Sequence, residues 1–285
     1  MIDFTPALRE QALQVLERYK VGTSPFTPPI LGSVNGLLGA IGAGTATNWP
    51  GSAYDPETHT VFAQAGNMVS ARSLVAPPAG FSDIQYVEGI GGRPFQVVLG
   101  PGDCCAADAG RSQRPENQPA TPPPSAASAP AGARAETGLN VQGLPIVKPP
   151  YGTLAAINLD RGEILWRVPH GDTPDAIRNH PALQGINIPK TGQPGTSGVG
   201  LMVTKTLVVM GDPQITAPPG RPRGAMLRAY DKKTGQEVGA VWMPAPQSGS
   251  PMTYMVDGKQ YIVVAVSGGA YSGEYLAFSV PEDAR

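Results

Sequence analysis

Residues 156–166, AINLDRGEILW, recur in modified form at residues 229–239, AYDKKTGQEVG. Both stretches follow the pattern A-x-[N/D]-x-x-x-G, in which an apolar segment enters a polar turn and a second segment leaves it. Asn or Asp at the start of such a turn hydrogen-bonds the nearby backbone, and Gly adopts the positive φ that the turn requires. Each copy is therefore predicted to be a strand–turn–strand unit.

The repetition of this unit indicates the architecture. A single hairpin cannot bury an apolar face well by itself, so repeated hairpins stack on one another. Radial stacking of small sheets produces a propeller. Trp166, at the end of the first copy, is expected to pack flat between neighbouring sheets.

Two further hairpins extend the pattern. Residues 53–65 contain a turn that begins at Asp55, although Thr58-His59 stands where the repeat has Thr-Gly, and residues 252–266 contain the strong turn signal Asp257-Gly258. We expect an all-β protein, a partial β-propeller of about three to four four-stranded blades within residues 1–285.

The N-terminal segment is predicted to be helical over residues 5–20. Thr5 is suited to cap the helix, Pro6 to occupy its first position, and apolar residues recur at helical spacing through Tyr19. A Pro/Gly-rich connection follows.

Residues 101–138 differ from the rest of the chain. The segment is rich in Pro and Ala and almost lacks large apolar residues, so it cannot bury enough surface to offset the entropy of ordering. We expect a disordered insertion here. Cys104 and Cys105 lie in it, either as two free thiols or as a strained vicinal disulfide.

Composition excludes several classes of function. Charged residues make up 15% of the chain and the formal net charge is −1, so no basic surface for nucleic acid is expected. No apolar run is long enough for a transmembrane helix, and residues 1–11 lack the basic and apolar regions of a signal peptide. Taken alone, these features favour a cytoplasmic protein.

Seven segments together carry a family resemblance: SPFTPPILGS, NWPGSAYDPETHTVF, QGLPIVKPPYGTLAAINLDRGEILW, GDTPDAIRNHPALQGINIPKTGQPGTSG, LMVTKTLVV, LRAYDKKTGQEV and PMTYMVDGKQYIVVAVSGG. In this order they resemble the bacterial quinoprotein dehydrogenases that use pyrroloquinoline quinone (PQQ), in particular the glucose-dehydrogenase-like branch. The resemblance implies an eight-bladed propeller with PQQ on its axis and Ca²⁺ beside it. It also implies oxidation of a sugar or alcohol, with electrons passed to a quinone or cytochrome, in the periplasm or on the periplasmic face of the inner membrane.

The resemblance covers only the C-terminal half of the family. The family's catalytic aspartate, its Ca²⁺ ligands and its quinone-facing Lys or Arg are expected upstream, so no catalytic or metal-binding residue is assigned to this chain, which is expected to be inactive alone. The Asn-Trp pair does carry over. Asn48 is expected to donate a hydrogen bond to a PQQ carboxylate, and Trp49 to place its indole edge near the axis. The alternative is a turn asparagine beside a packing tryptophan.

The remaining polar residues are interpreted as structural. His59, His170 and His180 lack metal-ligand spacing and are expected in loops or on the surface. Three loop carboxylates are expected to cap turns or to be solvated: Asp172, Asp175 and Asp212.

A rival function stays open, that of a non-catalytic propeller acting as a protein-binding scaffold. An open arc of blades leaves two apolar sheet faces uncovered. We therefore expect the chain to associate with itself or with an N-terminal propeller half.

Overall fold

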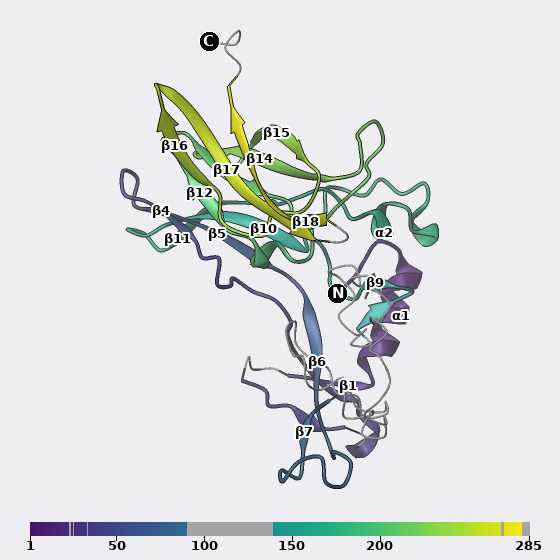
Figure 1. Ribbon diagram of the computed structural model, residues 1–285. Helices are drawn as coiled ribbons and strands as arrows, with labels where there is room; N and C mark the ends of the chain where they lie inside the picture. Colours follow the sequence, from purple (N-terminus) through teal and green to yellow (C-terminus); the bar gives the residue numbers. More distant parts are fainter. Residues whose placement is uncertain (23, 25, 33, 90–138, 269–270, 281–285) are drawn as a thin grey trace, which may run out of the picture. The chain divides into compact units, whose positions relative to one another are not determined.

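The computed structural model describes residues 1–22, 24, 26–32, 34–89, 139–268 and 271–280 (Figure 1). The predicted insertion at 101–138, with Cys104 and Cys105, lies outside the described residues. The chain divides into two compact units. One comprises Met1–Val15, Ala43–Ser70 and Ser128–Arg285, and the other Leu16–Gly42 and Ala71–Ala127.

The described part of the larger unit contains three antiparallel sheets of three or four strands. The first has the strand order β11-β10-β5-β4, in which β5 pairs with β10 although four other strands lie between them in the chain. Its strands are β4 (Ala53–Asp55), β5 (Thr60–Gly66), β10 (Gly152–Asn158) and β11 (Glu163–Pro169). The first copy of the repeat is the β10–β11 hairpin, as predicted.

The second sheet repeats this meander in the order β12-β13-β14-β15. Its strands are β12 (Leu201–Val203), β13 (Leu207–Gly211), β14 (Ala225–Asp231) and β15 (Glu237–Met243), and the second copy of the repeat forms the β14–β15 hairpin. Within that turn, Asp231 Oδ1 accepts hydrogen bonds from the backbone N–H of Lys233 and of Thr234, 3.0 and 2.8 Å away.

The third sheet has three strands, in the order β16-β17-β18. They are β16 (Met252–Val256), β17 (Lys259–Gly268) and β18 (Tyr271–Ser279). Asp257 and Gly258 link β16 to β17 with φ angles of 48° and 73°, the two positive values of a type I′ turn. This confirms the predicted hairpin.

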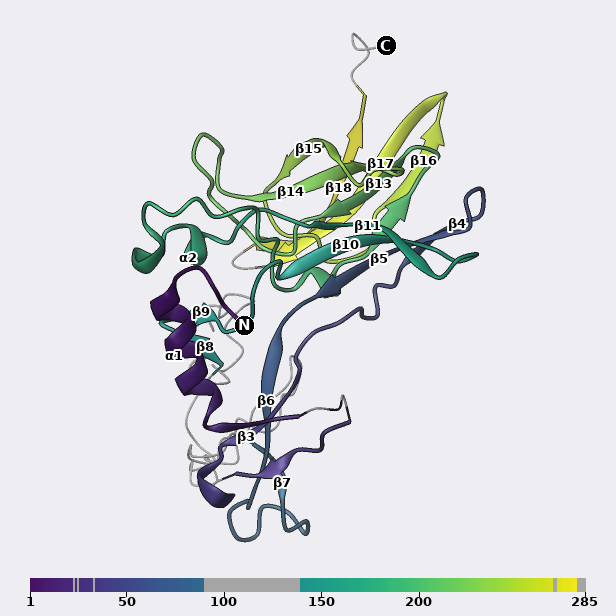
Figure 2. The same cartoon turned by 180° about the vertical axis from the view of Figure 1, so that it is seen from behind.

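The ribbons of the three sheets lie beside one another in Figures 1 and 2. Apolar layers join them. Between the first and second sheets lies a layer built from Phe62, Leu154, Ala156, Val199, Leu201, Val208, Met210 and Tyr230. Between the second and third lies one built from Val209, Ala225, Leu227, Met243, Ala245, Val264 and Val266. The single chain thus builds a stack of blade-like sheets.

Trp166 joins the first sheet to the turn of the second. Its Nε1 donates a hydrogen bond to the Lys232 carbonyl oxygen at 3.2 Å. The ring lies on Gly235, where a Cβ would come within 2.6 Å of Trp166 Cε3. The expected placement of Trp166 between neighbouring sheets is confirmed.

The edges of the first two sheets converge on one side, because the edge strands β4 and β12 lie against each other. The first two sheets therefore meet along these two edge strands as well as through the apolar layer between them.

The smaller unit departs from the blade pattern. Its sheet has the order β1-β3-β6-β2, with β7 also paired to β6, and two of these pairings are parallel. Its strands are β1 (Tyr19–Val21), β2 (Ile30–Leu31), β3 (Gly39–Ala43), β6 (Val69–Val75) and β7 (Val87–Gly89), with a 3₁₀ turn η1 (Val34–Gly36). The Pro/Gly-rich segment expected to be a plain connection therefore contains paired strands.

The N-terminal helix is shorter than predicted. Helix α1 spans Pro6–Leu16, and the Thr5 hydroxyl accepts a hydrogen bond from the Leu8 N–H at 3.1 Å, as expected of a cap. Tyr19 is buried and pairs with Gly39 in the parallel β1–β3 ladder, and this tertiary pairing ends the helix.

The remaining elements of the described chain are short. They are strands β8 (Asn140–Val141) and β9 (Leu144–Pro145), helix α2 (Asp175–Arg178), and the 3₁₀ turns η3 (Pro181–Leu183) and η4 (Thr196–Gly198). Most of the described chain is strand or irregular connection, and the fold is an all-β, partial β-propeller. Of the predicted three to four blades, the described residues provide two complete four-stranded sheets and one of three strands.

Candidate functional site

The predicted cofactor pair lies in an exposed turn before the edge strand β4. The Gly51 N–H donates to the Asn48 carbonyl oxygen at 3.0 Å, which closes the turn. The Trp49 side chain is 95% exposed, and Asn48 is exposed as well. Among the described residues nothing hydrogen-bonds the Asn48 amide side chain. The alternative was a turn asparagine beside a packing tryptophan. Asn48 does belong to a turn, whereas Trp49 does not pack against the rest of the described chain.

This arrangement fits a planar anionic ligand such as PQQ. A free side-chain amide donates hydrogen bonds to carboxylates, and an uncovered indole offers an aromatic surface to a flat ring system. Asn48 and Trp49 are the first two residues of this turn, and β4 begins at Ala53, shortly after Gly51. The two residues are thus accessible and chemically suited, and neither has another partner in the described part of the chain.

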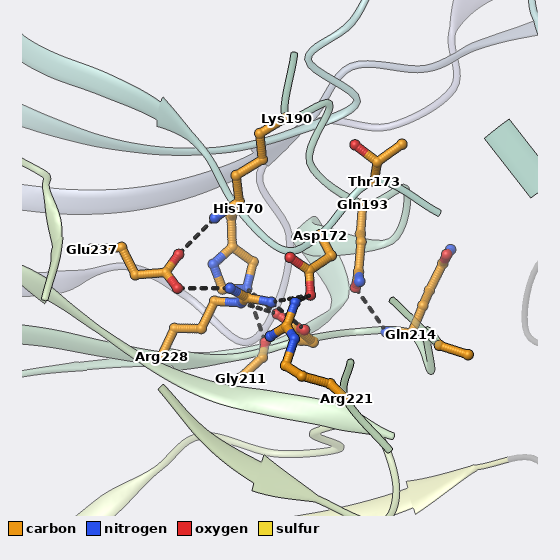
Figure 3. A network of polar contacts seen from close by, with 12 residues as sticks. His170, Asp172, Thr173, Lys190, Gln193, Gly211, Gln214, Arg221, Arg228 and Glu237 are labelled. Atoms are coloured by element: carbon orange, nitrogen blue, oxygen red, sulfur yellow. Dashed lines mark hydrogen bonds and ion pairs between the residues drawn. The ribbon is translucent and has the colours of Figure 1, made fainter. Parts of the chain in front are cut away.

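A second polar cluster lies in the interior of the larger unit (Figure 3). At its centre is Arg228 on β14, which donates from Nε to Asp212 Oδ1 at 2.6 Å and from Nη2 to Asp212 Oδ2 at 2.9 Å. Its Nη1 donates to Glu237 Oε1 and its Nη2 to Asp172 Oδ2, both at 2.8 Å. Three carboxylates therefore surround one guanidinium.

Two further cations complete the charge balance. Lys190 Nζ lies 2.6 Å from Glu237 Oε2, and Arg221 Nη2 lies 2.8 Å from Asp172 Oδ2. Asp172 and Lys190 belong to the connection between β11 and β12, whereas Arg228 and Glu237 belong to the second sheet. The cluster therefore ties the connecting loop to that sheet.

His170 extends the cluster toward the end of β11. Its Nε2 lies 3.0 Å from the Gly211 carbonyl oxygen and its Nδ1 lies 2.8 Å from the Tyr230 hydroxyl. A carbonyl can only accept, so Nε2 carries the proton and Nδ1 accepts from Tyr230. Burial lowers the pKa of His170 to about 3. His170 is thus a neutral, doubly bonded imidazole.

The pKa values of the carboxylates follow their surroundings. Burial raises the pKa of Asp212, against the hydrogen bonds from Arg228. Burial also opposes ionisation of Asp172, but Arg228 and Arg221 outweigh it and lower that pKa. Each charge has an opposite partner, so the cluster is suited to hold structure rather than to exchange protons near neutral pH.

His170 and Asp212 lie in loops, as expected, but both are fully buried, which contradicts the expectation that Asp212 is a capping or solvated carboxylate and that loop histidines lie at the surface. They are buried because the β11–β12 connection folds back over the second sheet, a contact between residues far apart in sequence. One local feature of the sequence could have indicated this cluster. Arg228 lies within the mostly apolar strand β14, and a guanidinium buried there needs carboxylate partners. Asp175 does bond locally, 2.6 Å from Arg178 Nη1.

The other histidines occupy turns. His59, at φ 47°, takes the place of the repeat's glycine, and its Nδ1 lies 3.0 Å from Asp160 Oδ1. His180 Nε2 lies 2.8 Å from the Gln142 carbonyl oxygen. Across the described residues, no group of three or more His, Cys, Asp or Glu side chains is arranged to hold a metal ion.

A family model for the glucose/ethanol/alcohol dehydrogenase β-propeller domain, whose name is PQQ, matches residues 1–262. The chain belongs to this quinoprotein family. The seven ordered segments predicted a quinoprotein dehydrogenase of the glucose-dehydrogenase-like branch, and membership of the quinoprotein family is confirmed.

Individual quinoproteins match over part of the chain. A 154-residue stretch is 34% identical to the probable quinate dehydrogenase (quinone) of Xanthomonas campestris pv. juglandis, covering 50% of this chain and 18% of that protein. A 159-residue stretch is 28% identical to quinoprotein glucose dehydrogenase A of Acinetobacter calcoaceticus, covering 54% of this chain and 18% of that protein. The matched stretches thus span less than a fifth of these relatives' length.

Among solved quinoproteins, the chain is similar to the quinohemoprotein alcohol dehydrogenase of Comamonas testosteroni. The TM-score is 0.43 and the sequence identity 19%, over 82% of this chain and 26% of that one. No helix among the described residues is both long and apolar enough to cross a membrane.

Proposed function

We propose that this chain forms part of a PQQ-dependent dehydrogenase that oxidises a sugar or an alcohol and passes the electrons to a quinone or cytochrome. Family membership supports the cofactor class, and the relatives' names include a glucose and a quinate dehydrogenase. The proposed location is the periplasm or the periplasmic face of the inner membrane, as the family resemblance implies. Ca²⁺ would accompany PQQ, with ligands from outside this chain.

The observation that carries the proposal is the free Asn48-Trp49 pair. An indole that is 95% exposed leaves a large apolar surface in water, which a bound planar ligand would cover. The adjacent Asn48 amide has no described side-chain partner, so it is available to a carboxylate. When bound, PQQ supplies a quinone that accepts the electrons of the substrate.

The two side chains have distinct roles in this proposal. Asn48 donates a hydrogen bond to a cofactor carboxylate, and Trp49 covers one part of the ring system and excludes water from it. Catalytic residues are assigned neither to these two positions nor elsewhere in the chain. A propeller completed by further blades would provide the base, and we expect the isolated chain to be inactive.

PQQ titration followed by tryptophan fluorescence tests the cofactor site. We expect saturable quenching, with a Kd raised roughly tenfold or more by Asn48→Ala, because a hydrogen bond to a charged group contributes about 1.5–3 kcal/mol. Asn179→Ala is the matched control, since Asn179 is also exposed and has no described side-chain hydrogen bond.

Trp49→Phe should remove most of the quenching, whereas Trp242→Phe, which alters another partly exposed indole, should leave the Kd unchanged. Equal affinity of the wild-type chain and Asn48→Ala would refute the cofactor contact. Dye reduction with glucose or simple alcohols by the isolated chain, supplied with PQQ and Ca²⁺, would refute the proposed absence of the base.

The second candidate function is a non-catalytic propeller that binds proteins. The exposed outer faces of the first and third sheets favour it, with Tyr54 and Ile164 on one and Tyr254 and Tyr275 on the other. Association with itself or with an N-terminal propeller half would cover these faces. Absence of any saturable PQQ binding, together with concentration-dependent association in sedimentation velocity, would favour this function.

A further inference from the structure

The smaller unit carries the one Asn-Gly pair of the sequence, Asn35-Gly36, in the 3₁₀ turn η1 between β2 and β3. Asn35 and Gly36 have φ angles of 53° and 76°, and both residues are exposed. The Leu37 N–H donates to the Val34 carbonyl oxygen at 3.1 Å and closes the turn. Among the described residues nothing hydrogen-bonds the Asn35 amide, so this side chain is free to move in water.

An asparagine followed by glycine can react with its own backbone. The backbone nitrogen of the following residue attacks the side-chain carbonyl carbon, Cγ, and closes a five-membered succinimide ring. A side chain on that following residue crowds the attacking nitrogen, and glycine has none. A Cβ at Gly36 would meet nothing within 4 Å, so no neighbouring group restrains this part of the turn.

Two other asparagines of the described chain show how the fold protects such an amide. The Asn67 side chain donates to two backbone carbonyl oxygens, both at 3.2 Å, and the Asn158 side chain accepts from the Arg161 N–H at 2.9 Å. The residues that follow them are Met68 and Leu159, whose side chains crowd the backbone nitrogen. Asn35 has neither form of protection.

The chain also contains the same backbone shape with a different side chain. Gln142 and Gly143 have φ angles of 53° and 85°, close to those of Asn35 and Gly36. The glutamine side chain is one methylene longer, so attack on it would close a six-membered ring, which forms far more slowly. Gln142 Nε2 also donates to Gln11 Oε1 at 2.8 Å. The Gln-Gly pair is therefore an unreactive reference within the same molecule.

We propose that Asn35-Gly36 is a site of spontaneous covalent modification, at which the chain deamidates through a succinimide. The Gly36 nitrogen forms a bond to Asn35 Cγ, the bond from Cγ to the side-chain nitrogen breaks, and ammonia leaves with the proton of the Gly36 N–H. Water then opens the ring at one of its two carbonyls, which leaves aspartate or isoaspartate at position 35. Ring closure requires the Asn35 ψ angle to leave its value of 29°, and a short exposed turn opens readily.

The reaction changes both charge and backbone at η1. A carboxylate replaces an amide, so the formal net charge of −1 becomes one unit more negative. Isoaspartate also inserts an extra methylene into the main chain of the turn between β2, which pairs with β6, and β3, which pairs with β1. The protein therefore exists in two charge forms whose proportion changes with its age.

Incubation of the 285-residue chain in water labelled with heavy oxygen, followed by peptide mapping with mass spectrometry, tests the proposal. We expect one solvent oxygen to enter at position 35 and the new residue to be part aspartate and part isoaspartate, the latter methylated by a protein L-isoaspartyl methyltransferase. The rate should rise with pH because the attacking nitrogen must lose its proton. Asn35→Gln should abolish the change, and Gln142 shows that glutamine adopts the required φ.

Asp257→Asn is the matched structural control. It places a second Asn-Gly pair in the β16–β17 hairpin with φ angles of 48° and 73°, beside the paired residues Val256 and Lys259. Opening that turn also breaks strand pairing, so position 257 should react roughly tenfold more slowly than position 35 of the same molecule. The proposal fails if Asn35 stays unchanged in the folded chain while it reacts in urea, or if positions 35 and 257 react equally fast.

Discussion

The guanidinium of Arg228 and the carboxylate of Asp212 form a two-bonded ion pair inside the larger unit, with N–O distances of 2.6 and 2.9 Å. Both side chains are almost completely shielded from water, at 2% and 0% exposure. Taking two charges out of water is costly, and the cost is offset only when every polar atom finds a partner. Asp172 accepts from Nη2 and Glu237 from Nη1 of the same guanidinium, so this pair depends on its neighbours.

Arg228→Met should destabilise the fold by about 3–5 kcal/mol, because it leaves Asp212 buried without a cation. The double variant Arg228→Met/Asp212→Leu should recover much of that loss. Urea denaturation measures both values. Arg221→Met is the control, since Arg221 pairs with Asp172 at the surface and should cost less than about 1 kcal/mol. Equal losses for the single and double variants would contradict the buried-pair argument.

The pH dependence of stability should report His170. In the unfolded chain this imidazole titrates at its ordinary pKa of 6.5, whereas in the folded protein burial lowers the pKa to about 3. The unfolded state therefore binds one proton more between these values. The free energy of unfolding should fall by about 1.4 kcal/mol per pH unit as the pH drops through this window. In urea denaturation at several pH values, His170→Gln should reduce the slope of the free energy of unfolding against pH in this window. The same slope in the variant and the wild type would contradict the assigned role of His170.

Gly235→Ala should weaken the contact between the first two sheets. Gly235 has φ 72°, and an added Cβ would come within 2.6 Å of the Trp166 ring. Gly258 has nearly the same φ, 73°, with nothing within 4 Å of its position, so Gly258→Ala is the matched control. We expect about 1–2 kcal/mol for the control from backbone strain alone, and about 1–3 kcal/mol more for Gly235→Ala from overpacking. Thermal denaturation of both variants would detect the difference, and equal losses would show that the ring does not restrain Gly235.

Loss of the hydroxyl should affect the stability of the fold differently at two buried tyrosines. Tyr151 has a buried hydroxyl without a described partner, whereas the Tyr230 hydroxyl donates to His170. Tyr151→Phe should be neutral or stabilising by up to about 1 kcal/mol. Tyr230→Phe should cost about 1–3 kcal/mol because it leaves the imidazole nitrogen unpaired. Chemical denaturation of the two variants compares them directly, and a large loss for Tyr151→Phe would reveal a partner for its hydroxyl.

Local chemistry made the hairpins predictable from sequence. Asp231 bonds the backbone of its own turn, and the Asp257-Gly258 pair adopts the positive φ values that a type I′ turn needs. Such interactions involve residues only a few positions apart, so the strand–turn–strand units and the all-β class could be deduced without a structure. The Asn48-Trp49 site came from the family resemblance and stays a prediction, to which the structure adds that both side chains are exposed.

Tertiary structure alone decided the end of α1, the burial of His170 and the Arg228–Asp212 pair. Each depends on which strand or loop meets which sheet: Tyr19 pairs with Gly39, and His170 lies against residues 41 and 60 positions away. A charged residue in a loop is equally compatible with solvent or with a buried partner until that packing is known, because its free energy depends on the dielectric and on the groups around it. The sequence by itself determined the repeating hairpins of this protein, whereas the stacking of its sheets decided which polar side chains became part of the core.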